Sequence, residues 1–132
     1  MKVKLSKFRC GTPRKPGEGW RIGTVRYLPR GVHKEDYQKR DFFDVWLPIL
    51  SPSRELVHWY LSQKGDETKI RRKFRRRYEK EMSAQDPRQV IQFLARVASV
   101  QPVAVGCYCE DENHCHRPIL FDLIAKAAEA QE

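Results

Sequence analysis

The chain has 132 residues, which is enough for one domain with its own hydrophobic core and too few for two. Hydrophobic residues make up 40% of it, but no run of about 18 apolar residues is present, which excludes a membrane-spanning helix. The net charge of +9 favours an anionic partner; the alternative is that the basic surface only maintains solubility. The start of the chain lacks the apolar block of a signal peptide, so we expect a cytoplasmic protein whose cysteines are reduced thiols.

The N-terminal region predicts two strands separated by a loop. Charged and apolar residues alternate over 3–10, which is typical of a strand with one buried face. The stretch 11–19 is rich in glycine, proline and basic residues and predicts a mobile basic loop. A second short strand is expected over 21–28. Pro29 and Gly31 end it, because proline cannot donate a ladder hydrogen bond and glycine tolerates a sharp turn.

Residues 41–50 form the most apolar stretch of the chain, which predicts core or the wall of a pocket. Trp46 lies in this stretch and is a candidate ligand-binding side chain, although a core position is the simpler interpretation. Ser51-Pro52-Ser53 then has the chemistry of a helix start, with a capping hydroxyl and a proline in the first turn. The helix is expected over 55–63.

A strongly basic helix is predicted from Asp66, its cap, to Met82. Its apolar residues are spaced four apart and form one narrow stripe, so most of its surface must face solvent. Arg72, Lys73 and Arg76 lie on the polar side and are the candidate residues for an alternative function in nucleic-acid binding.

The C-terminal part of the chain has the order of an α/β protein. A helix is expected over 87–99, a strand over 102–109 and a last helix over 116–130. The strand is apolar on both faces, as in the centre of a parallel sheet. We therefore predict a single compact α/β domain over 1–132, with a small, mostly parallel sheet covered by helices in a three-layer, Rossmann-like arrangement.

The junction between that strand and the last helix, residues 107–117, carries the most informative cluster of side chains. Cys107 and Cys109 lie at the predicted carboxyl end of the strand, where open α/β sheets bind ligands. Cys115 and His116 lie where the last helix begins, and the free N–H groups of a helix start attract anions and lower the pKa of a nearby thiol.

Three interpretations of the cysteines remain open. Cys107, Cys109, Cys115 and His116 are suitable zinc ligands, but two cysteines two residues apart in a strand do not form the usual zinc knuckle, so we expect no metal. The second interpretation is a reactive thiol or redox pair, although the spacing matches no standard redox motif. The third is structural, with the thiols as small buried side chains.

Several motifs along the chain resemble those of the domain-of-unknown-function family 488. They are Arg21-Ile22-Gly23-Thr24-Val25-Arg26, Pro29-Arg30-Gly31-Val32, Trp46-Leu47-Pro48, Phe74 with Tyr78 four residues later, and Cys115-His116-Arg117. The resemblance covers about residues 7 to 126 and is specific in combination. It implies a compact α/β domain of bacterial or archaeal type that usually stands alone, and it supplies no activity and no cofactor.

The leading functional hypothesis is that the domain binds a phosphorylated or nucleotide-like anion at a rim around the strand ends. Arg26, Arg30 and Arg117 would bind the anion, since an arginine can hold a phosphate with two hydrogen bonds. Glu110, His116 and Cys115 are the candidate catalytic groups if the ligand is also turned over. The alternatives are a nucleic-acid-binding accessory protein and a structural zinc domain.

Overall fold

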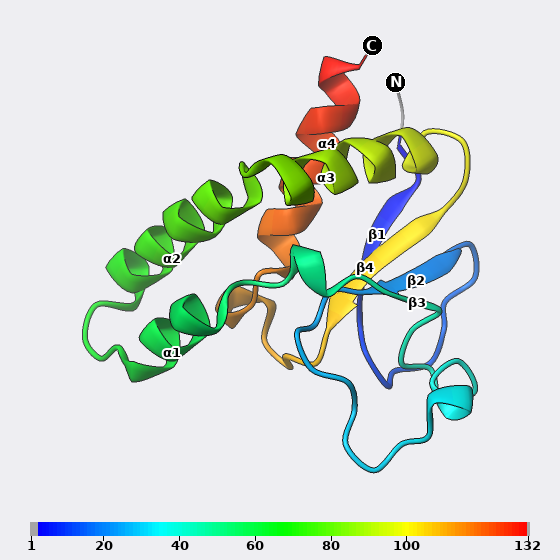
Figure 1. Cartoon of the computed structure of the whole chain (residues 1–132), viewed down its shortest axis with the longest axis horizontal. Helices are drawn as coiled ribbons and strands as arrows, with labels where there is room; N and C mark the ends of the chain where they lie inside the picture. The colour runs from blue at the N-terminus through cyan, green and yellow to red at the C-terminus, as the bar shows by residue number, and fades with distance from the viewer. Residues whose placement is uncertain (1–2, 132) are drawn as a thin grey trace.

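The computed structural model describes residues 3–131, with the side chain of residue 113 left aside. Its sheet has four strands, which are β1 (Leu5–Arg9), β2 (Trp20–Gly23), β3 (Val45–Trp46) and β4 (Val103–Cys107). The strand order is β1-β4-β2-β3 and every pairing is parallel (Figure 1). The predicted α/β class and the parallel sheet are confirmed.

The strand β4 is the centre of the sheet, as its apolar sequence predicts. Val103 aligns with Leu5 on one side and with Trp20 on the other. All five residues of β4 are buried. The predicted strands over 3–10, 21–28 and 102–109 are all present. Each is shorter than predicted, because in so small a sheet the residues at the strand ends have no neighbouring strand to pair with.

Four helices follow the predicted pattern: α1 (Arg54–Ser62), α2 (Glu67–Met82), α3 (Gln85–Ala98) and α4 (Arg117–Ala130). Ser53 caps α1 by accepting a hydrogen bond from the Leu56 N–H, and Asp66 caps α2 in the same way through its carboxylate. Short 3₁₀ turns lie at η1 (Lys34–Asp36), η2 (Pro48–Leu50) and η3 (Glu112–His114). Within the described residues, no helix is both long enough and apolar enough to cross a lipid bilayer.

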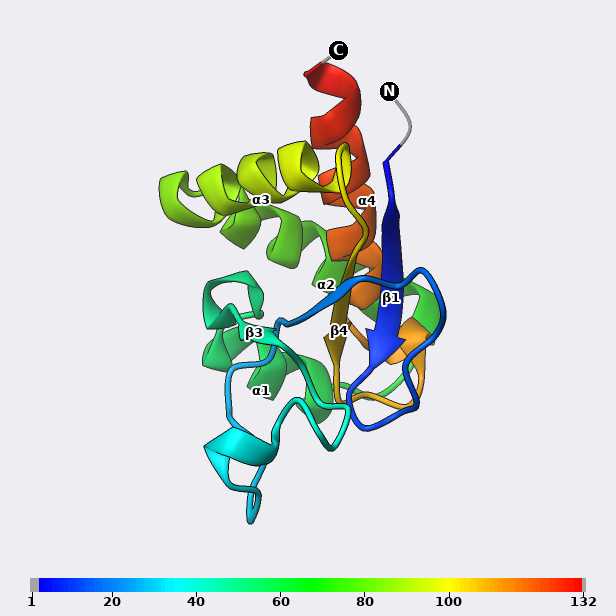
Figure 2. The same cartoon turned by 90° about the vertical axis from the view of Figure 1, so that its right-hand side faces the viewer.

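The sheet separates two hydrophobic cores. The helices pack on one face, where Val103 and Val105 of β4 meet side chains from α2, α3 and α4 (Figures 1 and 2). On the opposite face, Phe8, Phe43 and Ala104 form a smaller core beneath loop segments rather than helices. The three layers are therefore helices, sheet and loops.

Arg21 of β2 fastens the loop layer to the sheet. Its side chain is fully buried, lies 4.4 Å from the Phe8 ring centroid and forms a 2.6 Å ion pair with Glu18. The same guanidinium donates hydrogen bonds to the carbonyls of Thr12, Pro13 and Asp41. The basic loop that the sequence suggests to be mobile is thus held at several points by one side chain.

Candidate functional site

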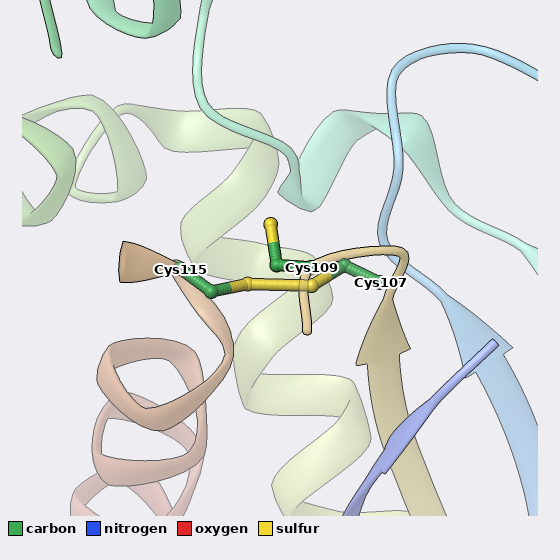
Figure 3. Close-up of side chains that lie close together, drawn as sticks. All are labelled: Cys107, Cys109 and Cys115. Atoms are coloured by element: carbon green, nitrogen blue, oxygen red, sulfur yellow. A yellow bond between two sulfur atoms is a disulfide. The ribbon is translucent and has the colours of Figure 1, made fainter. Parts of the chain in front are cut away.

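The junction follows the central strand, so it lies at the carboxyl edge of the sheet, as predicted. The Sγ atoms of Cys107, Cys109 and Cys115 lie within 4.8 Å of one another (Figure 3). Cys107 and Cys115 are joined by a disulfide, and Cys109 is a free, exposed thiol. The structure thus joins two of the thiols that the sequence suggests to be reduced, because the loop folds back and brings Cys115 against the end of β4.

His116 is buried, and its hydrogen bonds determine its protonation. Its Nε2 lies 2.9 Å from the Thr24 carbonyl, which can only accept, so Nε2 carries the hydrogen. Burial lowers the pKa of His116 to about 4. The hydrogen bond to Thr24 opposes this shift, and the positive charge of Arg117 adds to it. The ring is thus neutral at pH 7, and its Nδ1 lone pair lies on the side of the Cys115 sulfur, 3.8 Å away.

Arg117 occupies an interior position at the start of α4. Its guanidinium donates to the carbonyl of Phe8 at 2.9 Å and to the carbonyl of Cys109 at 3.0 Å. Only 3% of the residue is exposed. The structure therefore uses Arg117 to join the end of β1 to the cysteine loop, and Glu110 pairs instead with Arg9 at 3.2 Å.

A cavity of about 380 Å³, which we name the cysteine pocket, opens over the sulfur cluster. Its wall combines sulfur atoms, aromatic and aliphatic side chains and cationic or imidazole groups. The lining residues are Val25, Arg26, Tyr27, Pro52, Arg54, Val57, His58, Tyr60, Leu61, Phe74, Cys107, Tyr108, Cys109, His114, Cys115 and His116. Aspartate and glutamate are absent from this lining, as far as the described residues show.

The structure brings only part of the predicted rim together. Arg26 lines the cysteine pocket and donates two hydrogen bonds to the Pro52 carbonyl. Arg30 lines an adjoining hollow that shares the Tyr27, Arg54 and Tyr108 side chains with the pocket. Of the predicted site residues, Arg26, Cys115 and His116 therefore share one pocket and Arg30 lies next to it.

Three predicted residues lie elsewhere. Trp46 donates from Nε1 to the Val25 carbonyl and lines a separate hollow beside η1. Glu110 is exposed and is not part of the pocket wall. Arg117 borders a hollow on the β1 side of the sheet.

Sequence reasoning missed the residue best placed to meet an anion in the pocket. Arg54 is exposed in the first turn of α1, and its guanidinium lies 5.6 Å from the Tyr27 ring centroid and donates to the Tyr27 hydroxyl. Its position directly after the predicted helix start Ser51-Pro52-Ser53 was a usable signal, because helix starts favour negative ligands. Tyr108, which lies between Cys107 and Cys109, also lines the pocket and donates a hydrogen bond to the Tyr27 carbonyl.

Cys109 does not have the properties of an activated nucleophile. Partial shielding of the sulfur from water raises the pKa of its thiol, and the opposing effects of Arg117 and Arg71 do not reverse the shift. The sulfur is therefore mostly protonated at neutral pH when no other partner is bound to it.

Comparison with known families decides the relationship that the motifs suggest. A family model described as the active DUF488-N3 subclade matches residues 5–128. The chain belongs to this family. No curated protein and no solved structure matches it. For the DUF488-N3 domain described here, functional assignment therefore depends on the geometry of the site itself.

Proposed function

We propose that the cysteine pocket binds a small anionic ligand with a flat apolar part, such as a nucleotide, and that it does so in the cytoplasm. The observation that carries this proposal is the lining: it includes Arg26, Arg54 and two histidines besides the buried His116, and no described carboxylate. A cavity with cationic groups at its wall and without acidic ones has a positive potential, which favours anions.

The arrangement supplies a separate place for each part of such a ligand. Tyr60 and Phe74 stack with ring centroids 4.1 Å apart and give the pocket an aromatic wall suited to a flat apolar group. Arg54 belongs both to this pocket and to the adjoining hollow that contains Arg30. A phosphate at this border would meet two guanidinium groups, whose planar donors match its oxygens.

The proposal concerns binding, and a catalytic step would need groups that converge on the ligand. Cys115 and His116 line the pocket, but the Thr24 hydrogen bond holds the His116 proton, and the described lining offers no carboxylate to act as a base beside Cys115. Glu110 lies outside the pocket wall. Binding is therefore the function that this arrangement supports best.

Arg54→Gln tests the proposal. We expect nucleoside monophosphates to raise the melting temperature of the wild type, since they bind only the folded state. The variant should bind about 10- to 100-fold more weakly in calorimetry, because one charge-assisted hydrogen-bonding group is lost.

Arg88→Gln is the matched control, with the same charge change at an exposed position on α3 that lies outside the pocket wall. It should bind like the wild type. An equal loss in both variants, or a wild type that no nucleotide, sugar phosphate or inorganic phosphate stabilises, contradicts the proposal.

Nucleic-acid binding by α2 is the second candidate, and one observation favours it. Arg72, Lys73 and Arg76 are exposed, as predicted, whereas Arg75 is paired with Asp122 and Glu79. No ion pair within the described part of the chain involves Arg72 or Arg76. Both side chains are thus available to phosphates.

The free energy of unfolding of the double variant Arg72→Ala/Arg76→Ala should differ from that of the wild type by no more than about 0.5 kcal/mol, because both sites are on the surface. It should weaken RNA or DNA binding and reduce the slope of log K against log salt by about 2, one unit per lost phosphate contact. Arg88→Ala/Arg96→Ala removes the same charge from α3 and should leave the slope unchanged. If both pairs act alike, binding reflects net charge and not the α2 surface.

A further inference from the structure

We propose that Cys107, Cys109 and Cys115 bind a thiolate-seeking divalent cation, Zn²⁺ in the first place, when the Cys107–Cys115 disulfide is reduced. The three Sγ atoms are already within 4.8 Å of one another. In a tetrahedral zinc site with Zn–S distances of about 2.3 Å, the sulfur atoms are about 3.8 Å apart. Small side-chain rotations therefore suffice to place all three sulfurs around one ion.

The course of the backbone after β4 changes the expectation, drawn from the sequence, that these cysteines bind no metal. The expectation of no metal assumes that Cys107 and Cys109 both lie in a strand, which cannot form a tight knuckle. In the structure β4 ends at Cys107, and Cys109 belongs to the loop that follows. Figure 3 shows the three cysteines close together, Cys107 at the strand end, Cys109 in the loop and Cys115 in the segment that leads into α4.

Two hydrogen bonds of Arg117 support this set of ligands. The backbone N–H of Arg117 donates to the Cys115 sulfur at 3.5 Å, which stabilises a thiolate there. The Arg117 guanidinium holds the Cys109 carbonyl and so positions the loop that carries the second sulfur. These contacts are present before any ion binds, so the protein is prepared for the ligand set.

The site would leave one position of the ion open. All three cysteines line the cysteine pocket, so a fourth ligand would come from this cavity, either the His116 imidazole, whose Nδ1 lies 3.8 Å from the Cys115 sulfur, or a bound molecule. With a bound molecule there, three protein ligands and an accessible fourth position are the arrangement of catalytic rather than structural zinc sites. The inference stands on the sulfur geometry and does not rest on the anionic ligand proposed above.

The disulfide and the metal site are two states of the same sulfur atoms. An added phosphine reduces the disulfide with one water: the sulfur–sulfur bond breaks, two thiols form and the phosphine becomes its oxide. Metal binding then releases the thiol protons as thiolates form. Cytoplasmic thiol systems keep such pairs reduced, so the metal-binding state belongs to the compartment that we propose.

Cobalt titration of the phosphine-reduced, untagged protein tests the inference. We expect one Co²⁺ per chain, with near-ultraviolet sulfur-to-cobalt charge transfer and visible bands of tetrahedral Co²⁺, displaced by Zn²⁺. Unreduced protein should show neither signal. Cys109→Ser should weaken Co²⁺ binding by at least about 100-fold, because it removes a ligand, and changing even a residue that only holds a ligand in place costs up to about 100-fold.

Cys109 is exposed, so the serine variant should keep the fold, which circular dichroism checks. Cys10→Ser is the matched control, because Cys10 is a free buried thiol that is not part of the cluster, and it should bind Co²⁺ like the wild type. Absence of charge transfer in the reduced wild type overturns the inference. So does undiminished binding in Cys109→Ser.

Discussion

Replacing Arg21 by methionine is expected to lower the free energy of unfolding by about 3–5 kcal/mol, since removing one partner of a buried ion pair leaves an uncompensated charge. The Glu18 side chain is 4% exposed, so its carboxylate would stay buried beside an apolar side chain. The carbonyls of Thr12, Pro13 and Asp41 would lose their donor as well. Urea unfolding followed by circular dichroism measures the change.

Two further variants separate the ion pair from general effects of the loop. Lys15→Met changes an exposed residue of the same loop and should shift the unfolding free energy by no more than about 0.5 kcal/mol. Glu18→Gln added to Arg21→Met removes the buried charge and should recover part of the lost stability. If the double variant is less stable than Arg21→Met, the buried carboxylate is not the origin of the loss.

Arg117→Met should be similarly damaging, with a loss of about 3–6 kcal/mol for its two hydrogen bonds. The guanidinium makes two hydrogen bonds to buried or partly buried carbonyls, and bonds to charged groups contribute about 1.5–3 kcal/mol each. Methionine can fill much of the volume but supplies no donor. The sequence hypothesis, in which Arg117 binds an external anion, predicts little loss of stability.

Arg9→Met is the control for Arg117, because it removes an exposed arginine whose ion pair with Glu110 contributes at most about 1 kcal/mol. Melting curves with and without phosphate complete the test. Arg117→Met should melt lower than the wild type but gain the same increment from phosphate. A variant with wild-type stability that no longer responds to phosphate restores Arg117 as an anion ligand.

The sequence predicts the helices well because their signals are local. Asp66 caps α2, and apolar residues every fourth position identify its buried side, where Phe74, Tyr78 and Met82 lie. The strands are predicted less well because their ends depend on partners far along the chain. β3 has only two residues and exists because they pair with Ile22 and Gly23, which no local pattern reveals.

The location of the site is predictable, but the direction of its side chains is not. The strand-to-helix junction lies at the edge of the sheet, as expected from the rule for α/β proteins. His116 and Arg117 are adjacent in sequence, yet His116 forms part of the pocket wall, whereas the Arg117 side chain reaches the Phe8 carbonyl on the neighbouring strand β1. Similarly, the sequence around Arg21 is that of an ordinary polar strand residue, and only the structure shows that loop carbonyls surround its guanidinium.

The central position of β4 has a consequence for how the protein is made. β1 leaves the ribosome early, but its described strand pairing is with β4 alone, which is encoded near the other end of the chain. β2 also pairs with β4, although its other partner, β3, is close to it in sequence. Pairings between distant segments fold slowly, and unpaired strand edges attract other chains. During synthesis, the N-terminal strand must therefore wait with its edges unsatisfied until residues 103–107 emerge, and a nascent chain halted before that point would be the species most prone to aggregate.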